Sequence, residues 1–189
     1  MLIITGCRRG EIAGLKWSKV DFKKKILTID NNLLSTHDKN KPTIEGTRVY
    51  EDTTKGKQAR HIKISNETVA VLKEWEMHQK EMKTSAGSHW KELDFVFTRE
   101  DGLPICPGSV NIFLRKFSER YNLPHIKPHK LRHTLASNLI NQGVDIVTVS
   151  NRLGHAQTST TLNVYSHVVN KADEKLAEQA ADMFLRKKD

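Results

Sequence analysis

Four side chains within residues 128–167 are of the types that act on a phosphodiester: His129, Arg132, His155 and Tyr165. A phosphodiester under attack gathers negative charge on its non-bridging oxygens, and an arginine offers a planar fork of donors that fits two such oxygens. A neutral histidine can donate one hydrogen bond or accept a proton near pH 7. Together the four residues indicate a phosphate clamp followed by a nucleophile.

The nucleophile in this interpretation is Tyr165. A tyrosine hydroxyl has a pKa of about 10, so roughly one molecule in a thousand is ionised at neutral pH. Such a nucleophile needs a base or a strongly positive pocket beside it. A single tyrosine near a helix end is usually structural, so Tyr165 gains its meaning from the histidines and the arginine that precede it.

The first helix expected to position these residues begins at Pro128, which lacks an N–H and suits a first helical turn. His129 and Arg132 are three apart and are therefore neighbours on its surface. Gly143 is predicted to end this helix in a left-handed conformation. The apolar residues that recur at helical spacing, and should face the core, are Leu131, Leu135, Leu139 and Ile140.

A second and a third helix are expected to follow. Asp145 can cap the second helix, and Gly154 would stop it and leave His155 at the corner. The inward-facing residues of this helix are Ile146, Val149 and Leu153. One of residues 158–160 would begin the third helix, which delivers Tyr165.

Two other interpretations of this stretch stay open. A helix, a glycine turn and a second helix are also the pattern of a helix-turn-helix DNA reader, which is the stronger alternative. His129 and His133 are four apart, as in some zinc sites, but the HExxH pattern requires Glu after the first histidine, and Lys130 stands there. We therefore expect no metal ion and no cofactor.

The whole chain carries an excess of positive charge. It has 31 Lys and Arg against 22 Asp and Glu, a formal net charge of +9 over 189 residues, which favours a polyanionic partner, nucleic acid first. Cys7 and Cys106 are expected to be reduced thiols of an intracellular protein. With no signal peptide and no long apolar segment in this sequence, we expect a cytoplasmic protein without a membrane span.

A further arginine and a carboxylate lie near the start of the chain. Thr5 or Gly6 can cap a helix that continues through Lys16, in which Arg8 and Glu11 are three apart and share a face. The residues of this helix expected to face the core are Ile12 and Leu15.

Strands are predicted between these regions. β-branched or alternating residues favour strands at 26–29, 43–50 and 60–64, after a turn at 17–22 and around a polar loop at 31–42. A short strand or extended piece is expected at 95–97.

Two more helices complete the expected fold, capped by Asn66 and Ser109. Their apolar side chains are Val69, Leu72, Trp75 and Met82 in the first, and Ile112, Phe113, Phe117 and Tyr121 in the second. The elements predict an α+β fold that is mainly α-helical with a small three-stranded antiparallel sheet.

At these residues the chain resembles the catalytic domain of the tyrosine recombinases, the phage integrase family of site-specific DNA recombinases. The stretches similar to the family motifs are residues 129–134 (His-x-x-Arg-His-Thr), 153–155 (Leu-Gly-His), 159–167 (a Ser/Thr run, then Tyr-x-His), 5–11 (Thr-Gly-Leu-Arg-x-x-Glu) and 55–60 (Lys-Gly-x-x-x-Arg). Cys7 stands where the fourth of these motifs has Leu. The resemblance implies the fold of a DNA breaking-rejoining enzyme.

The resemblance also implies a role for each catalytic residue. Arg8 and Arg132 would hold the non-bridging oxygens, and His155 would add a hydrogen-bond donor. His129 would help to accept the proton of the tyrosine. Lys55 would protonate the departing 5′ oxygen, which is sensible for a lysine whose pKa nearby arginines lower.

Supporting roles are implied for two other residues. Glu11 would hold the arginines in place without acting as an acid, and His133 would support the clamp. The neighbouring Arg9 and Lys57 are the competing candidates for the first clamp arginine and for the general acid.

The function that the resemblance implies is site-specific DNA recombination, as in an integrase. DNA strands would be cleaved and rejoined through a 3′-phosphotyrosyl intermediate, with double-stranded DNA as the partner. The alternatives are a non-catalytic helix-turn-helix-like DNA-binding regulator and a type IB topoisomerase-like relaxing enzyme.

Residues 1–189 are expected to form a single catalytic domain of this kind. Family members usually carry an N-terminal DNA-binding domain that closes around the duplex, so we expect an N-terminally truncated chain that lacks it. Residues 173–187 are expected to form a tail helix with one apolar stripe. Because family members often pass such a tail to a neighbouring protomer, self-association on DNA through this helix is expected.

Overall fold

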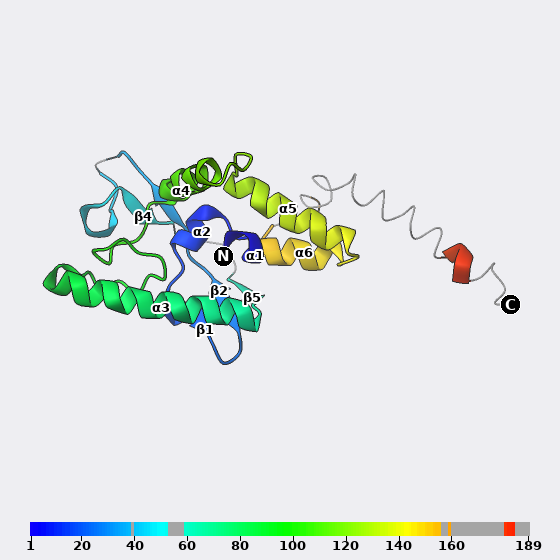
Figure 1. Cartoon of the computed structure of the whole chain (residues 1–189), viewed down its shortest axis with the longest axis horizontal. Helices are drawn as coiled ribbons and strands as arrows, with labels where there is room; N and C mark the ends of the chain where they lie inside the picture. Colours follow the sequence, from blue (N-terminus) through cyan, green and yellow to red (C-terminus); the bar gives the residue numbers. More distant parts are fainter. Residues whose placement is uncertain (39, 53–58, 156–158, 160–179, 184–189) are drawn as a thin grey trace. The chain divides into compact units, whose positions relative to one another are not determined.

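The computed structural model describes residues 1–38, 40–52, 59–155, 159 and 180–183. The chain divides into two compact units, Met1–Arg132 and His133–Asp189, and each is described by itself (Figure 1). Lys55, Tyr165 and the predicted tail helix at 173–187 lie outside the described residues, apart from positions 180–183 of that tail.

A three-stranded antiparallel sheet organises the first unit, in the order β1 (Val20–Asp21), β2 (Ile26–Ile29) and β5 (Arg60–Lys63). Leu27 pairs with Ile62, and both are buried on one face of the sheet. The alternate positions carry Thr28 and His61 to the other, exposed face, where their side chains lie 3.1 Å apart. Since the strands alternate in this way, the sheet has one buried and one solvated face.

The sheet has three strands, as predicted, but β1 takes the place of the strand predicted at 43–50. The region 17–22, for which the sequence predicts a turn, forms a 3-10 helix, η1 (Trp17–Lys19), and then β1, which pairs with β2. A tight turn joins the two strands, with Lys25 at a φ of 54° and the Asp21 side chain accepting from the backbone N–H of Lys24 at 2.8 Å.

The strand predicted at 43–50 is mostly not a strand. Residues 44–46 form a short 3-10 turn, η2 (Ile44–Gly46), in which Glu45 departs from helical geometry. Glu45 and Gly46 have φ values of 46° and 70°, which a β-ladder does not accept. Only β4 (Val49–Glu51) is extended. It pairs with β3 (Leu33–Ser35), inside the region predicted as a polar loop, to form a separate two-stranded sheet.

The single helix predicted at the start of the chain is two short helices, α1 (Leu2–Thr5) and α2 (Arg9–Ala13). Gly6 does not begin a helix. It ends α1 in a left-handed conformation, with φ 67° and ψ 15°. Arg8 is the N-cap of α2, and the helix ends at Ala13 rather than Lys16.

Helix α2 packs against β3 at Gly10. A Cβ atom at this position would lie 2.3 Å from Asn32 Oδ1 and 2.4 Å from the carbonyl oxygen of Leu33. Only a glycine allows this close approach. The contact brings the start of α2 next to residues 32–35.

The buried face of the main sheet is covered by α3 (Asn66–Ala86), which runs alongside β1, β2 and β5 (Figure 1). Ser65, rather than the predicted Asn66, is its N-cap, and the Ser65 side chain accepts from the backbone N–H of Thr68. The main core cluster joins α2, the sheet and α3, and Leu2 of α1 packs against it. Its buried members are Cys7, Ile12, Leu15, Leu27, Ile29, Ile62, Ile64, Leu72 and Val96. The piece predicted at 95–97 is not a strand: Phe95 forms an isolated bridge with Lys16, and residues 96 and 97 form a bend.

Helix α4 (Pro107–Arg120) begins two residues before the predicted cap at Ser109, with Pro107 in the first turn after Cys106. Its buried residues are Pro107, Val110, Leu114 and Ser118. The apolar side chains that the sequence assigns to it are mainly exposed: Ile112, Phe113, Phe117 and Tyr121. Phe117 and Tyr121 contact each other along the helix surface with ring centroids 4.7 Å apart.

The helix pair predicted after Pro128 is confirmed as α5 (Pro128–Asn141) and α6 (Ile146–Leu153). Gly143 has the expected positive φ of 84°. The Asp145 side chain caps α6 by accepting from the backbone N–H of Thr148 at 2.8 Å, and Gly154 ends α6 in a left-handed conformation. The core of the second unit is formed by Ala136, Ile140, Val149 and Leu153.

The observed fold is helical with a small antiparallel sheet, as predicted. Among the described residues, no helix combines the length and the apolar character needed to cross a membrane.

Candidate active site

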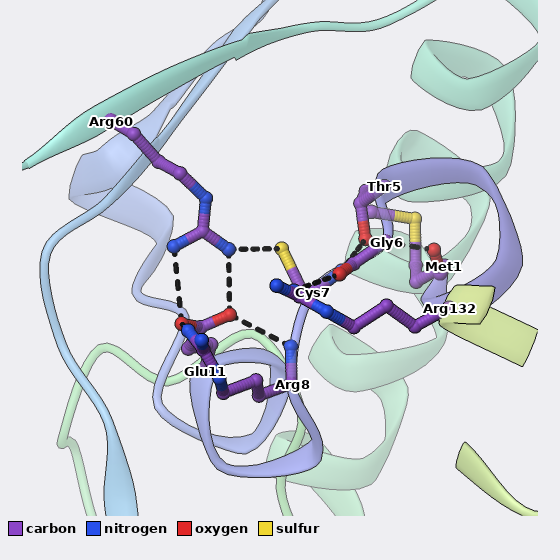
Figure 2. A network of polar contacts seen from close by, with 8 residues as sticks. All are labelled: Met1, Thr5, Gly6, Cys7, Arg8, Glu11, Arg60 and Arg132. Atoms are coloured by element: carbon purple, nitrogen blue, oxygen red, sulfur yellow. Dashed lines mark hydrogen bonds and ion pairs between the residues drawn. The ribbon is translucent and has the colours of Figure 1, made fainter. Parts of the chain in front are cut away.

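The carboxylate of Glu11 is the centre of a buried polar network (Figure 2). Its Oε1 accepts from Arg8 Nη1 at 2.9 Å and from Arg60 Nη1 at 3.1 Å. Its Oε2 accepts from the backbone N–H of Arg8 at 2.7 Å and from Arg60 Nη2 at 2.6 Å. Each carboxylate oxygen therefore binds one donor from each arginine, so a single acid holds the two arginines together.

Local structure explains how these side chains meet. Arg8 is the N-cap of α2 and Glu11 is its third residue, so the Glu11 carboxylate reaches back to the Arg8 backbone N–H in the manner of a capping box. Arg60 is the first residue of β5 and lies opposite Ile29 of β2. The sheet thus delivers the second arginine, from a position 49 residues away in sequence from Glu11.

Arg132 reaches the same region from the first turns of α5. Its Nη1 donates to the carbonyl oxygen of Gly6 at 2.5 Å. The residue is only 6% exposed, and among the described residues Arg132 Nη2 has no hydrogen-bond partner. A buried guanidinium nitrogen without an acceptor is energetically unfavourable unless a ligand supplies one.

The pKa values reflect this arrangement of charges. Burial alone would raise the pKa of Glu11, but the hydrogen bonds and charge of Arg60, followed by those of Arg8, lower it. Burial likewise opposes the charge of Arg60, but Glu11 outweighs it and raises that pKa. Burial and then the charge of Arg8 lower the pKa of Arg132 to about 10, so it is still charged at neutral pH.

Cys7 lies inside this group of arginines. Its Sγ accepts from Arg60 Nη2 at 3.5 Å, and the guanidinium groups of Arg60 and Arg132 approach it from two sides (Figure 2). Burial raises the pKa of the Cys7 thiol, so the thiol is neutral. The cluster thus contains three guanidinium groups, those of Arg8, Arg60 and Arg132, and one carboxylate, that of Glu11, which gives a net charge of about +2.

A cavity of about 310 Å³ opens beside the network. Arg8, Arg9, His129 and Arg132 line it together with Cys7, Gly10, Pro107, Pro128 and residues 32–35. Of the described residues that line it, none is acidic. The cavity therefore suits an anion of moderate size, with donors on the side formed by α2 and α5.

A second cavity, of about 520 Å³, shares three wall residues with the first: Arg9, Pro128 and His129. Its other lining residues come from α4 and the segment before α5, and they are Asn111, Ile112, Arg115, His125, Ile126 and Lys127. Its described lining is also without an acid. The two cavities thus form a continuous basic surface along α2, α4 and the start of α5.

The predicted site residues fall into three groups. The structure brings together Arg8, Glu11, His129 and Arg132, as the sequence led us to expect. His133 and His155 belong to the second compact unit, His155 directly after the residue that caps α6. Lys55 and Tyr165 lie outside the described residues. The structure thus shows which of these residues lie together, and the catalytic role of each of them remains a prediction.

Arg60 is the residue of this network that the sequence did not single out as functional. The motif at 55–60 ends on Arg60, and this position was the feature of the sequence that could have identified Arg60 as functional. Strand periodicity placed it on a strand but gave no partner for it. Arg9, the competing candidate for the first clamp arginine, lines both cavities, whereas Arg8 is the arginine hydrogen-bonded to Glu11.

Known proteins resemble this chain over nearly all of its length. The tyrosine recombinase XerC-like protein of Caldanaerobacter subterraneus is 36% identical over 191 residues, which cover 96% of this chain and 47% of that protein. The ICEBs1 integrase of Bacillus subtilis is 28% identical over 95% of this chain and 46% of its own length. The chain thus spans about half the length of these curated relatives.

Solved structures share the fold. The Tn1549 transposon integrase in complex with transposon right end DNA matches with a TM-score of 0.72 at 23% identity, over 93% of this chain and 56% of that one. The XerA recombinase matches with a TM-score of 0.65 at 24% identity, over 98% of this chain and 56% of that one.

The family assignment is confirmed by the match of residues 1–172 to the Phage integrase family. The relatives named tyrosine recombinase and integrase agree with it. The chain belongs to the phage integrase family, the tyrosine recombinases.

Proposed function

We propose that this chain is the catalytic part of a site-specific DNA recombinase that transfers strands through a tyrosine. One observation carries the proposal: a buried cluster with a net charge of about +2 contains Arg132 Nη2, which has no acceptor among the described residues, and lies beside an acid-free cavity. A phosphodiester has one negative charge, and a second accumulates as a nucleophile attacks. The cluster fits the attacked phosphate better than the resting one, which is what catalysis requires.

The proposed reaction proceeds in two balanced steps. The Tyr165 hydroxyl oxygen attacks the phosphorus while the bond from phosphorus to the 5′ oxygen breaks. His129 helps to accept the tyrosine proton, and Lys55 donates a proton to the departing 5′ oxygen. A 5′ hydroxyl from a partner strand then attacks the 3′-phosphotyrosyl bond and releases Tyr165, so the phosphoester bond count is unchanged.

Arg8 and Arg132 take the non-bridging oxygens in this proposal, with His155 as an additional donor and His133 as a support. Arg8 lines the cavity with a side chain that is 39% exposed, whereas Arg132 lies deeper. From this difference we infer that Arg132 fixes the phosphate while Arg8 closes over it.

The second cavity extends the proposed path of the DNA strand. Because it shares Arg9 and His129 with the first cavity, a strand whose scissile phosphate occupies the first must pass it. Arg115 and Lys127 would then contact backbone phosphates of neighbouring nucleotides.

The biological setting follows from the substrate. Relatives are named integrases, transposases and recombinases, and one structural neighbour is the Tn1549 integrase in complex with DNA. We infer that double-stranded DNA is the partner, that the protein acts in the cytoplasm with the nucleoid, and that it associates with further copies on DNA through the tail helix at 173–187. Residues 1–172 match one family, so both compact units would belong to one catalytic domain.

The test is capture of a covalent adduct. The chain is mixed with a randomised library of nicked duplexes, in which a cleaved end diffuses away and traps the phosphotyrosyl bond. Wild-type protein should give an SDS-resistant adduct whose sequenced DNA reveals the preferred site, and Tyr165→Phe should give none while still shifting DNA in a gel.

Two results would contradict the proposal. An adduct that persists in Tyr165→Phe removes Tyr165 as the nucleophile. Sequence-selective DNA binding by the wild type, with no adduct on any selected site, is the result expected of a non-catalytic regulator. Adduct formation together with plasmid relaxation that lacks site preference would instead favour a topoisomerase-like activity.

A further inference from the structure

We propose that Arg60 is a positioning residue of the strand-transfer site, which keeps Glu11 from competing with the phosphate for Arg8. This inference rests on the proposed function, since it assumes that Arg8 binds a phosphate. Arg60 is not among the residues that line the cavity, so its role is exerted through Glu11 and not by contact with DNA.

The hydrogen bonds of Glu11 support this role. Both carboxylate oxygens accept from Arg60, at 3.1 and 2.6 Å, in the bidentate geometry that arginine forms best with a carboxylate. Arg8 reaches the same carboxylate with one guanidinium nitrogen, Nη1, and with its backbone N–H. Arg60 therefore holds the bidentate position on Glu11, and Arg8 has the single-nitrogen position.

Removal of Arg60 would change which donors bind the Glu11 carboxylate. Glu11 would lose two of the four hydrogen bonds that the structure records for it, and its carboxylate could turn to take the guanidinium of Arg8 in a bidentate pair. A phosphate uses the same two-nitrogen face of an arginine. Glu11 and the phosphate would then compete for Arg8, and the net charge of the cluster would fall from about +2 to about +1.

Two further observations show that Arg60 is built into the site. Its side chain is 15% exposed and that of Glu11 is 7% exposed, so the pair is shielded from water and is stronger than a surface ion pair. Arg60 is fixed by its place in β5 opposite Ile29.

The experiment compares Arg60→Gln, Glu11→Gln and the double variant Arg60→Gln/Glu11→Gln. In Arg60→Gln, adduct formation at saturating DNA should slow on the order of 100-fold, as expected for a misplaced catalytic group. The double variant should recover at least about tenfold of that loss, because a neutral glutamine in place of Glu11 does not compete for Arg8 and can still cap α2. Because removal of both charges can also restore folding, the comparison uses only folded protein, in which a purely structural Arg60 would leave the adduct rate unchanged.

A second readout does not depend on catalysis. Titration of dimethyl phosphate, followed by the melting temperature, should show weaker binding by Arg60→Gln than by the wild type, and recovery in the double variant. The anion titration separates the two proposals. A wild type that binds dimethyl phosphate but makes no adduct refutes the proposed function, while the anion affinities of the three variants still test the role of Arg60.

Folding and charge loss are controlled separately. The double variant removes both charges of the Arg60–Glu11 pair, so it should fold even if Arg60→Gln is unstable, and circular dichroism checks this. Arg99→Gln, which breaks the surface pair between Arg99 and Asp101, is the matched control and should behave as the wild type. Wild-type rate and anion binding in Arg60→Gln, or a double variant no better than Arg60→Gln, would overturn the inference.

Discussion

Arg60 and Arg132 are two buried arginines of one cluster that the fold treats in opposite ways. Arg60 faces both oxygens of Glu11, which raises its pKa. Arg132 has one backbone carbonyl as its acceptor, and its pKa is lowered to about 10. The shift from 12.5 corresponds to an unfavourable free energy on the order of 3 kcal/mol in the charged state.

This difference indicates that Arg60 has a structural role in the site and that Arg132 has a ligand-binding role. The fold compensates the charge of Arg60 internally, so Arg60 stabilises the protein without any ligand. For the charge of Arg132, we infer that an anion provides the compensation. Because a buried unpaired charge is destabilising, its presence in a cavity is better explained by ligand binding than by stability.

The largest effect is expected from replacing Arg132 by methionine. Adduct formation should fall by roughly 10³-fold or more, since a positioned arginine contributes about 10³–10⁵ to phosphoryl transfer. The free energy of unfolding should nevertheless rise, by about 1–3 kcal/mol, because an apolar side chain replaces an uncompensated buried charge. Urea denaturation followed by circular dichroism measures this change.

Arg60→Met is the matched control, and its stability should change in the opposite direction. Removing one partner of a buried pair leaves the other charge uncompensated, so a loss of about 3 kcal/mol is expected. If the two methionine variants lost similar stability, the distinction between a compensated and an uncompensated arginine would be wrong.

The pH dependence of stability should sharpen the comparison. The pKa of Glu11 in the fold lies below its ordinary value of 4.5, so its contribution is fully present above about pH 4.5 and is lost as the pH falls through the folded pKa. The stability difference between wild type and Glu11→Gln should therefore shrink between about pH 6 and pH 3.

The corresponding difference for Arg132→Met should stay flat over the same range, because Arg132 is protonated at all of these pH values. Urea unfolding at a series of pH values measures both differences. A Glu11→Gln difference that did not vary with pH would mean that Arg60 and Arg8 do not hold the carboxylate in its charged form.

A smaller effect is expected when sulfate takes the place of a phosphate. Sulfate should raise the stability of the wild type by about 1.4 kcal/mol when its concentration is about ten times its dissociation constant. Arg132→Met should lose this response, because it removes Nη2, which has no acceptor among the described residues. The melting temperature at constant ionic strength, with chloride as the reference salt, is the measurement. Equal stabilisation of both proteins would show that sulfate binds elsewhere.

The sequence predicted the parts of the site whose causes are local. Pro128, Asp145 and Gly154 define the ends of α5 and α6 by their own chemistry, and these boundaries are confirmed. Arg8 and Glu11 are three residues apart, and their contact is also confirmed.

The errors arose where two local rules compete or where the partner is distant. Gly6 suits both ends of a helix, and only the structure shows that it ends α1. The β-branched character of 43–50 favoured a strand, but the positive φ of Glu45 interrupts it. Arg60 pairs with Glu11 across 49 residues, and no periodicity in the sequence encodes such a contact.

The smallest predicted effect concerns the second cavity, and it tests whether the two basic cavities have different roles. Arg115 and Lys127 line only the second cavity, and neither contacts the Glu11 network in the recorded hydrogen bonds. If they bind backbone phosphates, each alanine substitution should lower the slope of log affinity against log salt by about 1. The adduct rate at saturating DNA should stay unchanged, because the proposed position of the scissile phosphate is the first cavity.

Fluorescence anisotropy with a duplex at several salt concentrations measures the slopes. Lys80→Ala is the control, since Lys80 lies on α3 with a side chain that is 70% exposed and pairs with Glu76 at 3.2 Å. An equal loss of slope in Lys80→Ala would indicate a diffuse effect of net charge. A loss of adduct rate in Arg115→Ala or Lys127→Ala would mean that the two cavities form one catalytic surface. The first cavity could then no longer be regarded as the site of catalysis and the second as a site that only binds the DNA strand.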